Sequence, residues 1–219
     1  MTDAHPPETV ERTTGSNITA SVIWLHGLGA DGNDFAPLVD ELTMTGPAGL
    51  RFVFPHAPIQ PVTVNGGMQM RAWYDIRGLG DGIEEDPSGL DQANAIVEAL
   101  LQREHERGIP DERMILAGFS QGAATALYAS LHTQRAIAGI IALSGWLPKT
   151  ALAAPATTPP VFMAHGTQDP VVPIQLGRNS AQRLSDIGFP VSWQEYPMDH
   201  AVCMPEIQAL DGWLSQRLG

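Results

Sequence analysis

Residues 114–123 read MILAGFSQGA, an apolar run followed by the start of an alanine-rich segment. The apolar run has the composition of a strand buried on both faces, and the segment after it has that of a helix. At the junction, residues 118–122 form a G-x-S-x-G pattern around Ser120. Glycines two positions before and after a serine allow a strained strand-to-helix turn that exposes the hydroxyl at a helix N-terminus. The pattern therefore predicts a nucleophile at Ser120, with an idle serine in a tight turn as the alternative.

Short apolar runs and segments of helical period alternate on both sides of this junction. Most of the short runs are apolar nearly throughout, as in a parallel sheet covered on both faces, whereas residues 191–196 alternate and suit a sheet edge. Strands are predicted at residues 21–25, 51–54, 114–117, 139–143, 161–164 and 191–196, and helices at residues 35–42, 90–107, 121–131, 174–187 and 205–218. This order predicts an α/β fold with a mostly parallel, doubly wound sheet and flanking helices.

Length and charge limit the class of protein. The 219 residues fit one domain, which we place at residues 18–219 behind a flexible N-terminal segment at residues 1–17. Acidic residues outnumber basic ones by 24 to 12, and the formal net charge is -12. Because the basic residues form no cluster, nucleic acid is not expected as a partner.

Cysteine use and hydropathy bear on the compartment. The single cysteine, Cys203, cannot form an internal disulfide, so the fold does not depend on an oxidising environment. The N-terminal segment lacks the basic start and apolar stretch of a signal peptide, and no apolar run long enough to span a bilayer follows. We therefore expect a cytoplasmic protein without stable membrane insertion.

A second glycine pattern competes with the first. Residues 27–32 match G-x-G-x-x-G between the first predicted strand and a helix, which is the context of a dinucleotide-binding loop. A nicotinamide site also requires an acidic residue at the end of the second strand, where residues 54–58 read FPHAP. A nucleotide-dependent oxidoreductase therefore remains only a distant alternative.

A serine nucleophile needs a general base, in practice a histidine oriented by a carboxylate. In hydrolases with this serine turn the chain order is Ser, then Asp or Glu, then His. Of the seven histidines, only His200 has acids between it and Ser120, and these are Asp169, Asp186, Glu195 and Asp199. Asp169 follows a buried strand, where open sheets place functional groups, whereas the others lie beside the histidine, in a helix or in mid-strand. We predict Asp169 as the orienting acid, with an Asx turn before Pro170 as the alternative.

Serine attack on an ester creates an oxyanion, which requires preorganised N–H donors. One donor is expected to be the backbone of Gln121, the residue after the nucleophile, and the other to come from the loop after the first strand. Within residues 27–32 we assign the second donor to Leu28. His26, directly before that loop, is predicted to hold it by hydrogen bonds rather than to act as a base.

Five ordered motifs together resemble a known family. They are HGLGADGNDF at residues 26–35, WYDI at residues 73–76, GFSQGA at residues 118–123, HGTQD at residues 165–169, and His200. They resemble the phospholipase/carboxylesterase family of α/β-hydrolases, which includes acyl-protein thioesterases and small bacterial carboxylesterases. The resemblance spans about residues 18–218 and implies an α/β-hydrolase fold, a triad of Ser120, Asp169 and His200, and Leu28 and Gln121 as oxyanion donors. The sequence Ala-Val-Cys after His200 is more similar to the bacterial branch.

The resemblance also implies a substrate groove beside the nucleophile. Candidate wall residues are Met68, Met70, Trp73 and the loop at residues 78–86, each of which could equally be ordinary packing. Acidic residues concentrate in and beside this loop, so neutral or cationic esters are expected to react better than anionic ones.

These observations predict a serine carboxylesterase that hydrolyses short to medium acyl esters through an acyl-enzyme on Ser120. Thioesters and lysophospholipids are further candidate substrates, and an acyl-protein thioesterase or lysophospholipase is the main alternative. A catalytically silent binding module on the same fold is a distant one. No metal or organic cofactor is expected, the partner is a small-molecule ester, and the protein is expected to be a monomer or homodimer.

Overall fold

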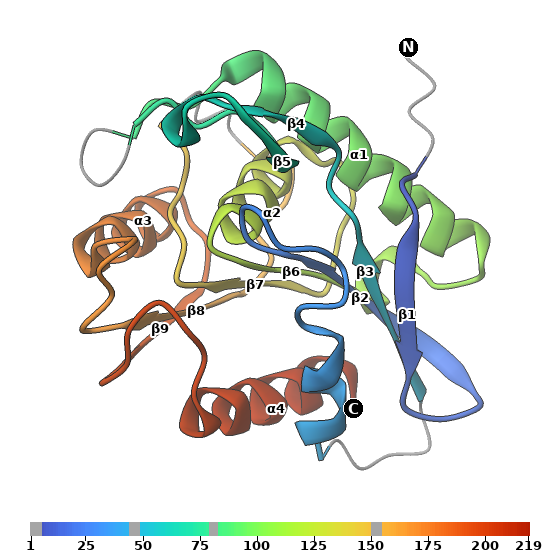
Figure 1. Cartoon of the computed structure of the whole chain (residues 1–219). Coiled ribbons are helices and arrows are strands. Elements are labelled where there is room, and N and C mark those ends of the chain that lie inside the picture. The colour runs from blue at the N-terminus through green and yellow to red at the C-terminus, as the bar shows by residue number, and fades with distance from the viewer. Residues whose placement is uncertain (1–5, 44–48, 79–82, 150–154) are drawn as a thin grey trace.

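A seven-stranded sheet forms the centre of the computed structural model, which describes residues 6–43, 49–78, 83–149 and 155–219 (Figure 1). The strand order is β1-β3-β2-β6-β7-β8-β9. Only β1 runs antiparallel to its neighbour, and all other neighbouring pairs in this sheet are parallel. The strands are β1 (Thr9–Thr13), β2 (Ile18–Leu25), β3 (Gly49–Pro55), β6 (Met114–Phe119), β7 (Gly139–Leu143), β8 (Val161–Gly166) and β9 (Val191–Tyr196).

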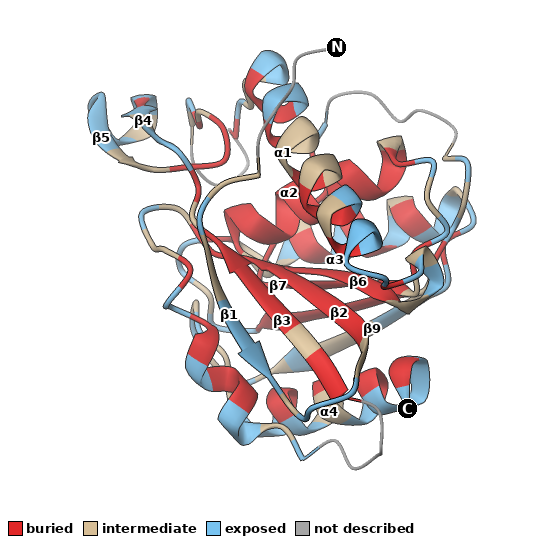
Figure 2. Ribbon diagram, turned by 90° about the vertical axis from the view of Figure 1, so that its right-hand side faces the viewer, coloured by how far each residue is buried: buried red, intermediate tan, exposed pale blue. Residues whose placement is uncertain are grey.

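Helices cover both faces of this sheet. The elements on one face are α1 (Pro87–Glu106), α2 (Gln121–His132) and α3 (Ile174–Asp186), and those on the other are the 3-10 helix η1 (Ala36–Glu41) and α4 (Met204–Leu218). Figure 2 shows the buried strands between α1, α2 and α3 above and α4 below. Short 3-10 turns η2 (Thr63–Asn65) and η4 (Asp111–Arg113) complete the helical elements of the described ranges.

Alternation along the central strands supplies both hydrophobic layers. On β2, Ile23 and Leu25 pack with α1 and α2, whereas Val22 and Trp24 pack with η1 and α4. All four side chains are almost completely buried. Because successive side chains of a strand point to opposite faces, a strand covered on both faces must be apolar throughout. The predicted α/β fold with a mostly parallel sheet is confirmed, and the alternating strand β9 lies at a sheet edge as expected.

The N-terminal segment requires a correction. Residues 1–17 were predicted to be flexible, but Thr9–Thr13 form β1 and pair with β3 from Thr9 opposite Pro55 to Thr13 opposite Arg51. Residues 1–5 of that segment lie outside the described ranges. The strand escapes detection because it lies at a sheet edge with an exposed face, so its sequence TVERT lacks an apolar run.

The segment before α1, which none of the predicted strands and helices covers, also contains regular structure. A separate two-stranded hairpin forms there from β4 (Ile59–Val62) and β5 (Met68–Arg71). Its side chains are mostly exposed or half-buried, so hydropathy does not mark it. The predicted helix at residues 35–42 is the short 3-10 helix η1, which has a proline in its first turn. None of the helices in the described ranges is both long and apolar enough to cross a membrane.

Candidate active site

The turn between β6 and α2 holds Ser120 in a strained conformation. Its φ is 55° and its ψ is -119°, outside the regions that non-glycine residues ordinarily adopt. A Cβ at Gly118 would lie 2.3 Å from the Gly122 carbonyl carbon, and one at Gly122 would lie 2.1 Å from the Leu25 oxygen. Both glycines are therefore required by close backbone contacts, and the serine hydroxyl is held at the carboxyl end of the sheet.

The structure brings the predicted nucleophile, base and acid together. His200 Nε2 lies 3.0 Å from Ser120 Oγ, and His200 Nδ1 lies 2.7 Å from Asp169 Oδ2. The Asp169 side chain is fully buried, and that of His200 is 17% exposed. When the Nδ1–H group donates a hydrogen bond to Asp169, Nε2 carries no proton and can accept the proton of the serine hydroxyl. The three side chains can thus activate a hydroxyl for attack on an electrophilic carbon.

Asp169 is fixed by its own turn. Its Oδ1 accepts hydrogen bonds of 2.8 Å from the backbone N–H groups of both Val171 and Val172. The Asx turn, considered as an alternative to an acidic role, is therefore present alongside the contact with His200. One oxygen closes the turn, which leaves the other to face the imidazole.

The loop that carries His200 is joined to the Asp169 turn by backbone contacts. Thr167 N–H donates to Tyr196 O at 2.8 Å, and Gln168 N–H donates to Met198 O at 3.0 Å. A Cβ at Gly166 would lie 2.3 Å from Asp199 O, so only glycine allows this close approach. These contacts set the spacing of base and acid across two adjacent loops.

His165 supports the same turn, a role that the sequence analysis did not assign. Its Nε2 donates to Val172 O at 2.8 Å and lies 3.4 Å from Asp169 Oδ2. Burial lowers the pKa of His165, which keeps the ring neutral beside the carboxylate. Its position four residues before Asp169, at the end of a buried strand, was the available signal.

The loop at residues 27–32 lies against the nucleophile turn. A Cβ at Gly27 would contact the Phe119 ring at 3.4 Å and Ser120 Cβ at 3.5 Å. His26 Nδ1 donates to Gly27 O at 2.7 Å, and His26 Nε2 accepts from Ala57 N–H at 3.0 Å. Burial lowers the pKa of His26, so the ring is neutral and bonded through both nitrogens. His26 therefore holds the loop through hydrogen bonds, as expected from the sequence.

Gln121 is the first residue of α2, where backbone N–H groups have no carbonyl partner within the helix. Its side chain contacts the segment after β5: Oε1 accepts from Trp73 N–H at 3.0 Å, and Nε2 donates to Tyr74 O at 2.7 Å. Trp73 Nε1 in turn donates to His26 O at 2.9 Å. The segments around Leu28 and Gln121 are the two candidate sources of oxyanion donors. These hydrogen bonds connect both segments to the buried residues Trp73 and Tyr74.

A pocket of about 250 Å³ opens beside Ser120. Ser120, Gln121, Leu28 and His200 form part of its lining. The rest of the wall is chiefly apolar and includes Ile76, Ile83, Trp146, Val171 and Val172. Trp146 is held in place because its Nε1 donates to Glu85 at 2.8 Å. The serine thus faces a hydrophobic chamber in which an uncharged chain can be buried.

The predicted substrate-contact residues need correction, because Met68, Met70 and Trp73 are not in the lining of this pocket. Met68 is 64% exposed on the β4–β5 hairpin, and the Met70 sulfur accepts a hydrogen bond from Asn65. Trp73 is 1% exposed and supports the site through its hydrogen bonds to Gln121 and His26. Sequence position beside a motif did not reveal which apolar side chains face the cavity, since that depends on packing.

The acidic residues near residue 80 are mostly paired within the protein. Asp75 lies 3.4 Å and Asp86 lies 3.7 Å from Arg77 nitrogens, and Glu85 accepts from the N–H groups of Trp146 and Lys149. Residues 79–82 of the predicted wall loop, Asp81 among them, lie outside the described ranges. The acidic residue in the described lining of the pocket is instead Asp34.

Comparisons with known proteins find relatives that match nearly the whole chain. A family model described as phospholipase/carboxylesterase matches residues 8–218. The chain is 38% identical to acyl-protein thioesterase 1 of Neurospora crassa over 91% of this chain and 87% of that protein. Among solved structures, Zea mays acyl-protein thioesterase 2 is 30% identical with a TM-score of 0.85, covering 97% of this chain and 100% of the other. Arabidopsis thaliana SOBER1 is 30% identical with a TM-score of 0.86, covering 92% and 100%.

Proposed function

This chain belongs to the phospholipase/carboxylesterase family of α/β-hydrolases and is a hydrolase of the esterase or thioesterase type, and we propose that it cleaves acyl esters through an acyl-enzyme on Ser120. The observation that carries the proposal is the continuous chain of contacts from Ser120 Oγ through His200 to Asp169 at the mouth of an apolar pocket.

The proposed reaction begins when Ser120 Oγ attacks the ester carbonyl and His200 Nε2 takes its proton. The N–H groups of Leu28 and Gln121 stabilise the oxyanion, and the imidazolium is stabilised by Asp169. His200 then gives the proton to the leaving oxygen or sulfur as its bond to the carbonyl carbon breaks. Water, activated by the same histidine, attacks the acyl-enzyme, releases the acid and restores the serine.

The apolar pocket suits the acyl part of the substrate. Its wall of aliphatic side chains and Trp146 offers little hydrogen bonding. Its volume of about 250 Å³ lies just below the usual range for ligand pockets, which starts near 300 Å³. Short to medium acyl groups are therefore the proposed substrates. The same machinery accepts thioesters, because sulfur is also a competent leaving atom.

Active-site labelling tests this function. A fluorophosphonate should modify the folded protein with one equivalent at Ser120, and Ser120→Ala should remove both the labelling and the hydrolysis of p-nitrophenyl butyrate. The change removes only the hydroxyl oxygen and should leave Gln121 and Leu28 in place, so the variant separates covalent catalysis from substrate binding. Folded wild-type protein that neither labels nor hydrolyses the ester would make the proposal wrong.

A second candidate, acyl-protein thioesterase activity, is favoured by the names of the Neurospora crassa and Zea mays relatives. Matched oxygen and sulfur esters of one acyl group distinguish the two. A thioester preference that grows when the thiol is part of a peptide would support the thioesterase, whereas equal kcat/KM values for both would support a general esterase.

A further inference from the structure

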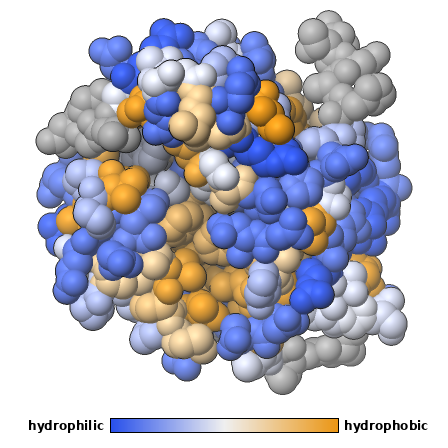
Figure 3. All heavy atoms as spheres, in the orientation of Figure 1, coloured by the Kyte–Doolittle hydropathy of each residue, from blue (hydrophilic) through white to orange (hydrophobic). Residues whose placement is uncertain are grey.

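A second groove adjoins the acyl pocket at His200. It has a volume of about 460 Å³ and is formed by η1, Phe119, the loop after His200 and the first turn of α4. Its apolar lining includes Phe35, Pro37, Leu38, Phe119, Val202 and Ile207. In Figure 3 hydrophobic side chains gather in the lower centre of the face, above α4, with hydrophilic side chains around them.

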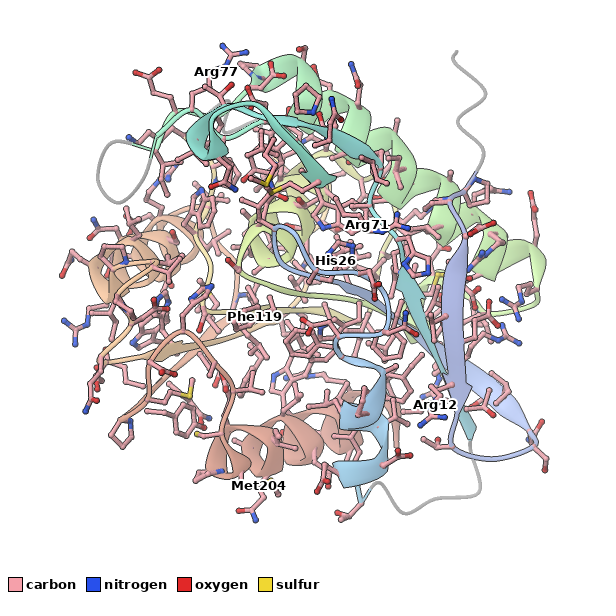
Figure 4. The ribbon with its side chains drawn as sticks, in the orientation of Figure 1. Arg12, His26, Arg71, Arg77, Phe119 and Met204 are labelled. Atoms are coloured by element: carbon pink, nitrogen blue, oxygen red, sulfur yellow. The ribbon has the colours of Figure 1, made fainter. Side chains whose placement is uncertain are left out.

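The two cavities meet at His200, the proposed general base. Asp34, Phe119 and His200 line both of them. The rings of Phe119 and His200 lie 4.8 Å apart, and Figure 4 labels Phe119 near the centre of the face, above the α4 end that carries Met204. The groove is therefore a continuation of the reaction centre rather than a remote surface feature.

The chemistry of the proposed reaction distinguishes the two sides. Leu28 and Gln121, which would hold the carbonyl oxygen, line the first pocket and are not in the described lining of the second. His200 must give its proton to the departing atom, so the leaving group has to lie on the histidine side of the carbonyl carbon. Resting on the proposed function, we infer that the second groove binds the alcohol or thiol half of the substrate.

The walls and rim of the groove indicate the class of leaving group. Apolar side chains form its floor, while Asp34 and Glu41 are its charged residues, and no lysine or arginine is in its described lining. Asp40 on the same 3-10 helix is paired with Arg12 at 3.0 Å, but Glu41 has no ion-pair or hydrogen-bond partner within the described residues. The preferred alcohol or thiol therefore has an apolar body and a cationic or neutral distal end.

Butyrate esters that differ only in the alcohol test this assignment. We expect kcat/KM to rise at least about tenfold from methanol to hexanol, because the open groove buries the five added methylenes in part. It should be about threefold higher for 6-aminohexanol than for 6-hydroxyhexanoic acid at low salt, and this ratio should fall at high salt. Because the acyl-enzyme is the same for all four esters, the deacylation rate from pre-steady-state kinetics should not depend on the alcohol.

Two substitutions locate the effect in the groove. Glu41→Lys should invert the preference for the amino alcohol over the carboxylate alcohol. Glu112→Lys makes the same charge change in η4, which precedes β6 and so lies at the end of that strand away from Phe119, and it should leave the preference unchanged. Val202→Trp should reduce the advantage of hexanol to less than about threefold by filling the groove. Val171→Trp, which narrows the first pocket, should instead change the dependence on acyl length.

The outcomes separate this inference from the function on which it rests. A protein that labels at Ser120 and hydrolyses esters with no dependence on the alcohol would overturn the groove assignment and leave the proposed function intact. A change in acyl preference caused by Val202→Trp would overturn it too, because the groove would then hold the acyl chain. Folded protein with neither labelling nor hydrolysis would overturn both.

Discussion

The two carboxylate oxygens of Asp169 have different partners, one in its own turn and one in the candidate active site. Oδ1 closes a turn with the N–H groups of Val171 and Val172, and Oδ2 faces His200. In Asp169→Asn the amide oxygen can keep the turn, but the amide nitrogen would donate to His200 Nδ1. The ring proton is then forced onto Nε2, which can no longer accept the proton of Ser120.

The expected result is a fall in kcat of about 10³–10⁴-fold with little change in thermal stability. Steady-state hydrolysis of an activated ester and a thermal melt measure the two effects. Asp186→Asn, which makes the same chemical change at the end of α3, is the matched control and should keep full activity. A loss of less than tenfold in Asp169→Asn would mean that this carboxylate does not orient the histidine.

The residues of the candidate site differ in how far the sequence predicts them. Ser120, Asp169 and His200 follow from chain order and from their places after buried strands, and the structure brings them within hydrogen-bond distance. The pocket wall is different, because Trp146 and Ile83 resemble any other buried apolar side chain in the sequence. Which apolar side chains face a cavity depends on packing between elements, and no local pattern reports it.

Among the elements, β1 shows which strands a hydropathy pattern can predict and which it cannot. The strands inside the sheet are apolar on both faces and stand out, whereas β1 pairs on one side only and has a polar sequence. The β4–β5 hairpin is not predicted from hydropathy for the same reason. An edge strand is defined by its partner's backbone, which a period in the sequence does not contain.

Removing β1 should therefore destabilise the fold without altering the site. Deleting residues 2–14 breaks a five-residue pairing with β3 and removes Glu11, which accepts from Arg107 at 2.7 Å. We expect the free energy of unfolding to fall by about 2–4 kcal/mol and Tm by roughly 5–10 °C. Because β1 lies three strands from β6, about 14 Å away, kcat at 25 °C should be unchanged.

A shorter deletion, of residues 2–7, leaves β1 in place and is the control. Thermal melts of the two truncated proteins and the full chain measure the difference. If both truncated proteins melt at the temperature of the full chain, the pairing of β1 with β3 does not stabilise the sheet.

On the scale of the whole molecule, the stability depends on pH through a carboxyl group in the layer of α4. Glu206, in the first turn of that helix, is fully buried, and neither of its oxygens forms a full hydrogen bond with another described residue. Burial raises the pKa of Glu206 to about 7, and the nearby Cys203 backbone N–H offsets only part of this effect. On β9, burial raises the pKa of Tyr196, and the negative charge of Glu206 raises it further.

The raised pKa fixes the sign of the pH dependence. Between about pH 4.5 and pH 7 the folded protein keeps the Glu206 proton while the unfolded chain releases it, so stability falls as pH rises through this window. The loss approaches roughly 3 kcal/mol. His26 and His165, whose pKa values are lowered by burial, act in the opposite direction at low pH, because the unfolded chain binds their protons first.

The difference between the wild type and Glu206→Gln isolates the carboxyl group from the two histidines. An amide stays neutral at every pH, so the variant should match the wild type near pH 4.5 and be more stable by roughly 3 kcal/mol at pH 8. Urea unfolding at several pH values measures this gap, and Glu112→Gln at an exposed position controls for the change of net charge. A gap that stays constant from pH 4.5 to pH 8 would show that Glu206 does not retain its proton in the folded protein.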